Sequence, residues 1–267
     1  MKRQLSAPRA LWTIAVPAIA IVMMPIVSVV WRTPWSRFLS SISGESSRMA
    51  LMLSLRTSTV TTLLALLFGT PLAWLLANQK FKLRSLVRAL CVLPMVLPPV
   101  VGGVALLFAF GRRGLIGSYL FEWFGIQLAF TQTAAVLAQF FVAAPFFIVV
   151  MEAAFEQVDQ RLVGVARTFG AKPWHTFFRI TLVMVRPSLI AGLALTWARA
   201  LGEFGATIAF AGNTPGRTQT VPLAVYSQLE SGNDDAISLS MLMMLVSLTI
   251  LIGLRGKWLG ALKRGAA

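Results

Sequence analysis

Six apolar stretches constrain this chain more than any other feature, because each is about long enough to cross a bilayer. Roughly 20 consecutive apolar residues span the hydrocarbon core as a helix. The first stretch, residues 11–31, contains no charged residue. The others are expected at 52–77, 87–110, 133–151, from about 183, and at 237–254. Because 57% of the residues are apolar and 12% charged, a disordered chain and most soluble enzymes are excluded. We predict an all-α membrane protein with six transmembrane helices.

Three spans depart from a plain hydrophobic helix. The stretch 52–77 carries Arg56 among small hydroxyl residues, a pattern typical of close helix packing or of a wet cavity. The stretch 87–110 contains three prolines, so we expect a kinked helix that is buried in protein. The fifth span ends near either Gly202 or Ala211. A cleaved signal peptide is the alternative for the first span, but its apolar run is too long and lacks a cleavage site.

Lysine and arginine concentrate in alternate connecting segments. Residues 2–9, 80–88, 161–179 and 255–264 hold most of the 24 basic residues. Because such residues favour cytoplasmic loops, we expect a multi-pass protein of the cell (inner or plasma) membrane with both termini in the cytoplasm. A net charge of +15 would also suit a nucleic-acid-binding protein. Here the charges lie in short loops between spans, so we expect these residues to contact membrane lipids. We do not expect the chain to bind nucleic acid.

The loop after the fourth span predicts a short surface helix. Asp159 can cap its start, Gly170 suits its end, and Pro173 suits the first turn of the next helix. From periodicity alone, this helix could lie on the membrane or dock in a groove of a soluble partner. Its apolar face recurs at positions i, i+3, i+4 and i+7: Leu162, Val165, Ala166 and Phe169.

The same loop resembles the EAA loop of ABC importer permeases. It starts with Glu-Ala-Ala at 152–154, carries Gly-Ala at 170–171, and ends in Ile-x-Leu at 180–182, where Val183 replaces the family's proline. The resemblance covers about 49–254 and implies the type I ABC importer (MetI-like) permease fold. It implies that the loop forms a coupling helix that seats in an ATPase subunit. The residues assigned to coupling are Glu152, Ala153, Ala154, Asp159, Leu162, Val165, Ala166, Phe169, Gly170 and Ala171.

The resemblance also divides the chain. Residues 1–48 are expected to form an N-terminal transmembrane helix and an outer loop. Residues 49–254 would form the transport core, and residues 255–267 a basic cytoplasmic tail.

The fifth span contains a pair of opposite charges. Arg199 and Glu203 are spaced i,i+4, and unpaired charges are costly inside a membrane, so we expect them to pair. The pair could be a structural ion pair that fixes the geometry of the helix, or it could line a transport path. Pro215-Gly216 in the following loop matches the centre of a type II turn.

Residues 198–207 and 212–226 read A-R-A-L-G-E-F-G-A-T and G-N-T-P-G-R-T-Q-T-V-P-L-A-V-Y. These stretches resemble the permease subunits of molybdate ABC transporters, and residues 97–103 fit the same group. The resemblance implies transport of molybdate or tungstate. Sulfate and thiosulfate permeases share the L-G-E-[FY]-G core and remain the alternative. An ion-coupled secondary transporter is a remote alternative, since only Glu203 could act as a midplane carboxylate.

A translocation path is predicted from polar residues, prolines and charges in or near the spans. The candidates are Arg56, Ser58, Thr61, Pro98, Pro99, Arg199, Glu203, Thr207, Asn213, Thr218 and Gln219.

The resemblance implies a machine of several subunits. It comprises a homodimer of this chain, two cytoplasmic ATPase subunits and an extracytoplasmic molybdate-binding protein. The sequence has no P-loop motif, so ATP and Mg²⁺ are expected in the ATPase, and this chain is expected to be a transport subunit without a cofactor. A single Cys and a single His also predict no metal site.

Overall fold

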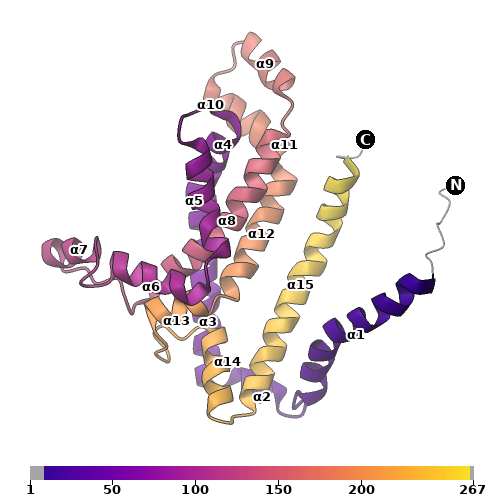
Figure 1. Cartoon of the computed structure of the whole chain (residues 1–267), viewed down its shortest axis with the longest axis vertical. Helices are drawn as coiled ribbons and strands as arrows, with labels where there is room; N and C mark the ends of the chain where they lie inside the picture. The colour runs from indigo at the N-terminus through magenta and orange to yellow at the C-terminus, as the bar shows by residue number, and fades with distance from the viewer. Residues whose placement is uncertain (1–8, 265–267) are drawn as a thin grey trace.

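The computed structural model describes the backbone of residues 9–264 and the side chains of residues 12–253 (Figure 1). Within that range the secondary structure is entirely helical. The basic residues expected to mark the two ends, in segments 2–9 and 255–267, have side chains outside the described part. The helices are α1 (Arg9–Arg32), α2 (Phe38–Ser43), α3 (Glu45–Leu64), α4 (Thr70–Asn78), α5 (Arg84–Val96), α6 (Pro99–Phe110), α7 (Gly117–Phe124), α8 (Gln132–Glu156), α9 (Gln160–Thr168), α10 (Pro173–Thr176), α11 (Leu182–Met184), α12 (Arg186–Leu201), α13 (Gly205–Ala211), α14 (Val221–Glu230) and α15 (Asp235–Arg264), with π-helical turns η1 (Ala65–Gly69) and η2 (Phe177–Thr181).

The all-helical membrane fold is confirmed. Four segments of the described chain are long and apolar enough to cross a membrane: Trp12–Arg32, Glu45–Asn78, Gln132–Glu156 and Asp235–Gly253. Two bent pairs of helices pass the same test when each pair is taken together, which gives up to six spans. These four segments and two pairs correspond to the six predicted stretches.

The third span is broken into two helices, which corrects the prediction of one kinked helix. Helices α5 and α6 meet at an angle of 120°. The break falls at Leu97, whose ψ of 138° is extended because the following residue, Pro98, disfavours helical backbone. The expected burial holds only in part, since α5 has no buried residue, whereas α6 buries Gly102, Gly103 and Leu106.

The fifth span is also divided. It takes the shorter of the two predicted ends, because α12 stops at Leu201 and α13 begins only at Gly205. The expected start near Val183 falls in α11, and α12 begins at Arg186. A bend of 73° separates α10–α11 from α12, and Pro187 lies in the first turn of α12, where proline is well tolerated.

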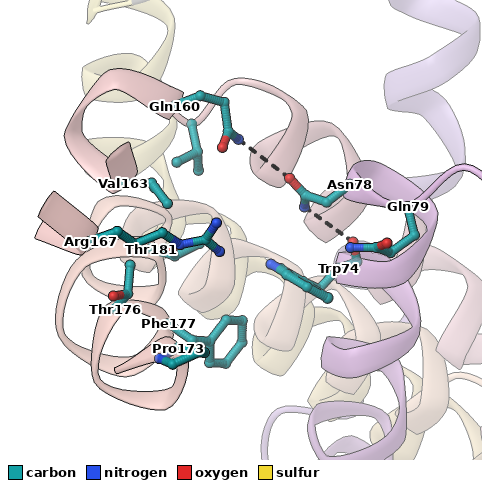
Figure 2. Close-up of a pocket in the computed structure, with 11 residues that line it drawn as sticks. Trp74, Asn78, Gln79, Gln160, Val163, Arg167, Pro173, Thr176, Phe177 and Thr181 are labelled. Atoms are coloured by element: carbon teal, nitrogen blue, oxygen red, sulfur yellow. Dashed lines mark hydrogen bonds between the residues drawn. The ribbon is translucent and has the colours of Figure 1, made fainter. Parts of the chain in front are cut away.

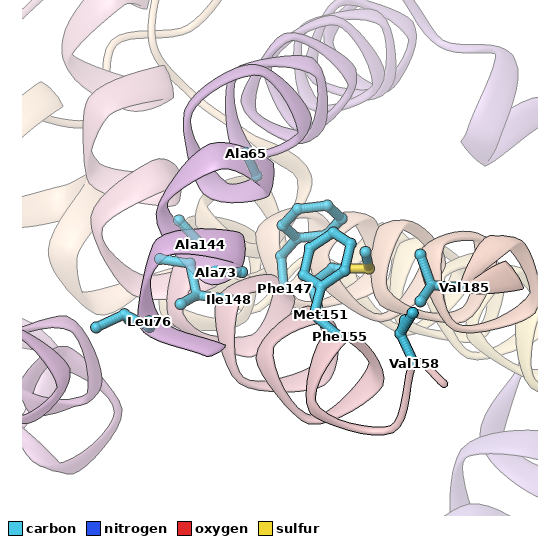
Figure 3. Packing of buried hydrophobic residues seen from close by; sticks show 10 residues of the cluster. All are labelled: Ala65, Ala73, Leu76, Ala144, Phe147, Ile148, Met151, Phe155, Val158 and Val185. Carbon is cyan, nitrogen blue, oxygen red and sulfur yellow. The ribbon is translucent and has the colours of Figure 1, made fainter. Parts of the chain in front are cut away.

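Helix α8 forms the centre of the molecule and packs against α3, α4, α5, α12 and α13. Figure 3 shows its large side chains Phe147, Met151 and Phe155 against small residues of the η1–α4 segment. Gly69 allows this approach, since a Cβ atom there would lie 2.7 Å from Cδ1 of Phe147. Such packing of large side chains against small ones stabilises contacts between membrane helices, where the hydrophobic effect does not drive association. Helix α1 has no buried residue in its apolar window and leans away from this centre (Figure 1).

Candidate functional site

Helix α9 forms because both of its ends carry local signals. The Asp159 carboxylate accepts a hydrogen bond from the backbone N–H of Arg161 at 2.9 Å, which satisfies one of the free donors at the helix start. Gly170 follows the helix with a φ of +80°, a left-handed conformation that suits glycine. Pro173 then begins α10. The predicted surface helix, its cap and its stop are confirmed.

Helix α9 projects from one end of the molecule (Figure 1), and the large side chains of its apolar face are exposed. Leu162, Val165 and Phe169 are 51%, 55% and 87% exposed. Ala166 is half-buried. Val163, which the periodicity did not single out, packs on the opposite side against the core cluster around α8. The three exposed side chains, hereafter the α9 stripe, are free to enter a groove of another protein.

The Glu-Ala-Ala motif at 152–154 lies in the last turns of α8 and not in the surface helix α9, which corrects its expected place in one helix with the apolar face. Glu152 is buried and accepts hydrogen bonds from Arg88, one of them from Nε at 2.8 Å. Glu156 lies 3.4 Å from Arg84 and 3.3 Å from Arg88. This network joins α5 to the end of α8, so Glu152 positions helices and does not face outward. The two arginines were not predicted as its partners, because nothing in the sequence indicates which loops meet.

The predicted pair of Arg199 and Glu203 is formed. Nη1 of Arg199 lies 2.7 Å from Oε2 of Glu203, whose side chain is 1% exposed. The pair does not lie along one helix, however, because α12 ends at Leu201. Oε1 of Glu203 also accepts a hydrogen bond of 2.8 Å from the backbone N–H of Ala206 in the first turn of α13. Glu203 therefore connects the end of one helix to the start of the next.

The hydroxyl groups of α3 mostly serve helix packing. Thr61 donates to the carbonyl of Val136 at 3.2 Å and to Oε1 of Gln139 at 3.3 Å, both on α8. Gln139 in turn donates to Thr57 at 3.1 Å. The fully buried Gln139 was missed, although a lone amide in an otherwise apolar span could have indicated it. Ser58 is buried as well, and its hydroxyl donates to the carbonyl of Leu55 at 3.2 Å.

The loop between α13 and α14 has a defined conformation that hydrogen bonds hold in place. Gly216 has a φ of +70°, and the N–H of Arg217 donates to the carbonyl of Thr214 at 3.1 Å, as the predicted turn requires. Thr218 is buried and accepts a hydrogen bond from the N–H of Thr214 at 3.0 Å. The next helix begins with the N–H of Val221, which donates to the hydroxyl of Ser54 on α3 at 2.8 Å.

The structure does not gather the candidate path residues into one site. Arg56, Pro98 and Pro99 are exposed. Gln219 is buried, and Asn213 donates to Ser227 at 2.7 Å. The hydroxyl of Thr207 is buried without a hydrogen-bond partner among the described residues. Most of the predicted donors are thus already used within the fold, so their role in a path remains a prediction.

The chain is similar to known proteins along most of its length. Residues 69–264 match the profile of the family described as binding-protein-dependent transport system inner membrane component. The molybdenum transport system permease protein ModB of Mycobacterium tuberculosis is 44% identical over 246 residues, which cover 92% of this chain and 93% of the relative. ModB of Escherichia coli K12 is 41% identical over 218 residues, which cover 82% of this chain and 95% of the relative.

Solved transporters share the fold. A chain of a bacterial alginate ABC transporter, in complex with its alginate pentasaccharide-bound periplasmic protein, superposes with a TM-score of 0.68 at 20% identity, covering 92% of both chains. A chain of the inward-facing MetNI methionine ABC transporter gives 0.58 at 18% identity, covering 80% of this chain and 99% of the other. Helical architecture, family profile and close relatives agree: this chain belongs to the family of binding-protein-dependent transport system inner membrane components.

Proposed function

We propose that this chain is the membrane-spanning permease subunit of an ATP-driven importer for a tetrahedral oxyanion, with molybdate or tungstate preferred over sulfate. The observation that carries this proposal is the 44% identity to a molybdenum transport permease across 92% of the chain. The hydrogen-bonded loop at 212–220 supports the proposal, because it contains residues on which the resemblance to molybdate permeases rests. Transport, and not chemistry on the anion, is the activity of this subunit.

The α9 stripe is the contact through which the movement that accompanies ATP hydrolysis reaches this chain. In this proposal it seats in a groove of the ATPase, and the ATPase binds ATP and Mg²⁺. The exposed positions of Leu162, Val165 and Phe169 support docking, since burying them against a partner removes apolar surface from water. Movement of α9 would reach the transport core through the segment that joins it to α8, where Glu152 and Arg88 fasten α5.

The complete importer is a homodimer of this chain with two ATPase subunits and an extracytoplasmic binding protein. Both termini lie in the cytoplasm, and the chain resides in the cell membrane. The α9 end of the molecule then faces the cytoplasm, and α2 and the turn between α14 and α15 lie at the opposite end (Figure 1). Two copies are needed because one subunit with six spans cannot enclose a transport path alone.

The anion is expected to pass without a deep binding well. Conduction requires contacts that are favourable enough for entry and weak enough for release. The internal bonding of Thr61, Thr218 and Asn213 agrees with this requirement, since few of the candidate donors stay free to hold an anion. Selection among anions then falls mainly to the binding protein.

The test is transport by the reconstituted complex. The chain, its ATPase and its binding protein are placed in proteoliposomes, and uptake of labelled molybdate is measured with and without ATP. ATP-dependent uptake that tungstate inhibits strongly and sulfate inhibits weakly is the expected result. Equal inhibition by sulfate would reassign the importer to the sulfate class. Uptake driven by an ion gradient without ATP would indicate a secondary transporter.

A further inference from the structure

A pocket of about 220 Å³ lies beneath α9, at the end of the span that α4 completes (Figure 2). One wall comes from α9 and carries Val163 and Arg167. The opposite wall comes from the last turn of α4 and carries Trp74 and Asn78, while α10 and η2 form the floor. A water molecule occupies about 30 Å³ of liquid, so the pocket is large enough for a multi-atom polar group.

The charge of this pocket is positive. The guanidinium of Arg167 and the indole of Trp74 reach into it from opposite walls (Figure 2). Neither side chain has a hydrogen bond or ion pair with another side chain of the described part of the chain. None of the residues that line the pocket is acidic. The carboxylate nearest in sequence, Asp159, is engaged in capping α9.

Two of the amide side chains that line the pocket, those of Gln160 and Asn78, are hydrogen-bonded. Gln160 donates to Oδ1 of Asn78 at 3.4 Å, and Nδ2 of Asn78 donates to the carbonyl of Trp74 at 3.1 Å. These bonds join α9 to the end of α4 and leave the Arg167 guanidinium as the strongest unused donor. A guanidinium with an indole N–H opposite matches an acceptor group that carries several oxygens and a negative charge.

The position of the pocket favours a membrane source for such a group. Trp74 and Asn78 lie in the last turn of the candidate span Glu45–Asn78. The ends of membrane spans are where a protein contacts lipid headgroups. The exposed Trp174 and Phe178 stack on each other nearby on α10 and η2, as aromatic residues do at membrane interfaces. Basic residues at this level attract anionic lipids.

We propose that the pocket beneath α9 binds a phosphate group through Arg167 and Trp74, and that in the membrane this phosphate belongs to an anionic lipid headgroup. The bound phosphate links α9 to α4, because its two main contacts come from these two helices. It therefore holds the α9 stripe in a fixed position relative to the spans. The proposal does not depend on which anion the chain transports.

The test measures lipid binding to the full chain in an uncharged detergent. Short-chain phosphatidylglycerol, the matching diacylglycerol without phosphate, and inorganic phosphate are titrated separately, and bound ligand is counted by native mass spectrometry. The variants are Arg167→Gln and the matched control Arg161→Gln. The control changes the same charge on the same helix, at an exposed position that does not line the pocket. Glutamine keeps the helix propensity of arginine, and the melting temperature verifies folding.

Phosphatidylglycerol should bind to the unchanged chain, and diacylglycerol should not. Arg167→Gln should weaken phosphatidylglycerol binding about tenfold or more, because a charge-assisted hydrogen bond is lost. Arg161→Gln should stay within about twofold of the unchanged chain. If inorganic phosphate binds with the same dependence on Arg167 and the lipid does not, the phosphate site stands and its source is free phosphate.

Two results would overturn the proposal. Equal loss of lipid binding in both variants would reduce the effect to general surface charge. Unchanged lipid binding in Arg167→Gln would remove the site, and a simultaneous loss of ATPase copurification would make Arg167 a docking residue instead.

Discussion

Glu203 makes two contacts at the junction of α12 and α13, so its charge can be tested separately from its hydrogen bond. Arg199→Met leaves the Glu203 carboxylate buried and without its partner. We expect this change to lower the free energy of unfolding by about 3 kcal/mol, because an uncompensated buried charge is costly. The double variant with Glu203→Gln should lose less, since no charge remains and the amide oxygen can still accept from Ala206.

The measurement is a double-mutant cycle on the purified chain in detergent, with unfolding followed by denaturant titration. The two single variants and the double variant are compared with the unchanged chain. Strictly additive losses would contradict a coupling between Arg199 and Glu203.

Single residues show how far sequence reasoning reaches at this scale. The i,i+4 spacing was sufficient to predict that Arg199 and Glu203 pair. It could not show that a helix break separates them, because the break depends on contacts with a distant segment. A Cβ atom at Gly205 would lie 2.7 Å from Cβ of Pro99, so the first residue of α13 packs directly against the start of α6. The partners of Gln139 were missed for the same reason.

Helices α6 and α13 approach each other closely at Gly103. A Cβ atom at Gly103 would lie 2.6 Å from Cβ of Ala209 and 2.7 Å from the carbonyl oxygen of Ala206. Because backbone and a short side chain cannot rotate away, Gly103→Ala should destabilise the chain by about 1–3 kcal/mol through overpacking. Thermal unfolding in detergent measures this loss.

The matched control for that variant is Gly253→Ala. A Cβ atom at Gly253 would meet nothing within 4 Å. The same chemical change should therefore alter stability by no more than about 1 kcal/mol. Equal effects at the two glycines would show that the α6–α13 contact is not as close as described.

The α9 stripe provides the prediction for coupling. Leu162→Asp or Phe169→Asp would place a charge in an apolar groove of the ATPase, which should weaken copurification by more than about tenfold and abolish uptake. Both side chains are exposed here, so the fold of the chain should persist. Thr168→Asp, at an exposed position of α9 outside the stripe, is the control. Normal copurification and uptake in either stripe variant would refute docking through α9.

Elements differ in how well local sequence defines them. Helix α9 was predicted with its cap and its end because Asp159, Gly170 and Pro173 are local signals. The broken spans were not, since consecutive prolines at 98–99 indicate an interruption but not its angle. That angle of 120° depends on where α6 finds a partner, which is a tertiary property.

At the scale of the whole molecule, hydropathy alone predicted an all-helical membrane fold. Apolar length is a property of each segment, and every backbone group in a membrane must bond internally, so few alternatives exist. The arrangement of the spans around α8 was not predictable from such lengths. It depends on small residues that meet large ones, as Gly69 meets Phe147, and a single sequence does not show these pairings.

The distribution of charge over the molecule predicts its orientation. Residues 80–88 and α9–α10 bring many of the basic residues to one end, while α2 and the turn after α14 lie at the other (Figure 1). Because Lys and Arg favour the cytoplasmic side, we expect α9 to face the cytoplasm. The chain has one native cysteine, Cys91, so replacing it by Ser permits labelling at single chosen sites.

Two exposed positions report the two ends, Gln157 beside α9 and Ser231 after α14. In intact cells, a membrane-impermeant maleimide should label Ser231→Cys and leave Gln157→Cys unlabelled. After permeabilisation both should react, which shows that each thiol is accessible. The inverse pattern would place α9 outside the cell, out of reach of any cytoplasmic ATPase, and would refute the orientation together with coupling through the α9 stripe.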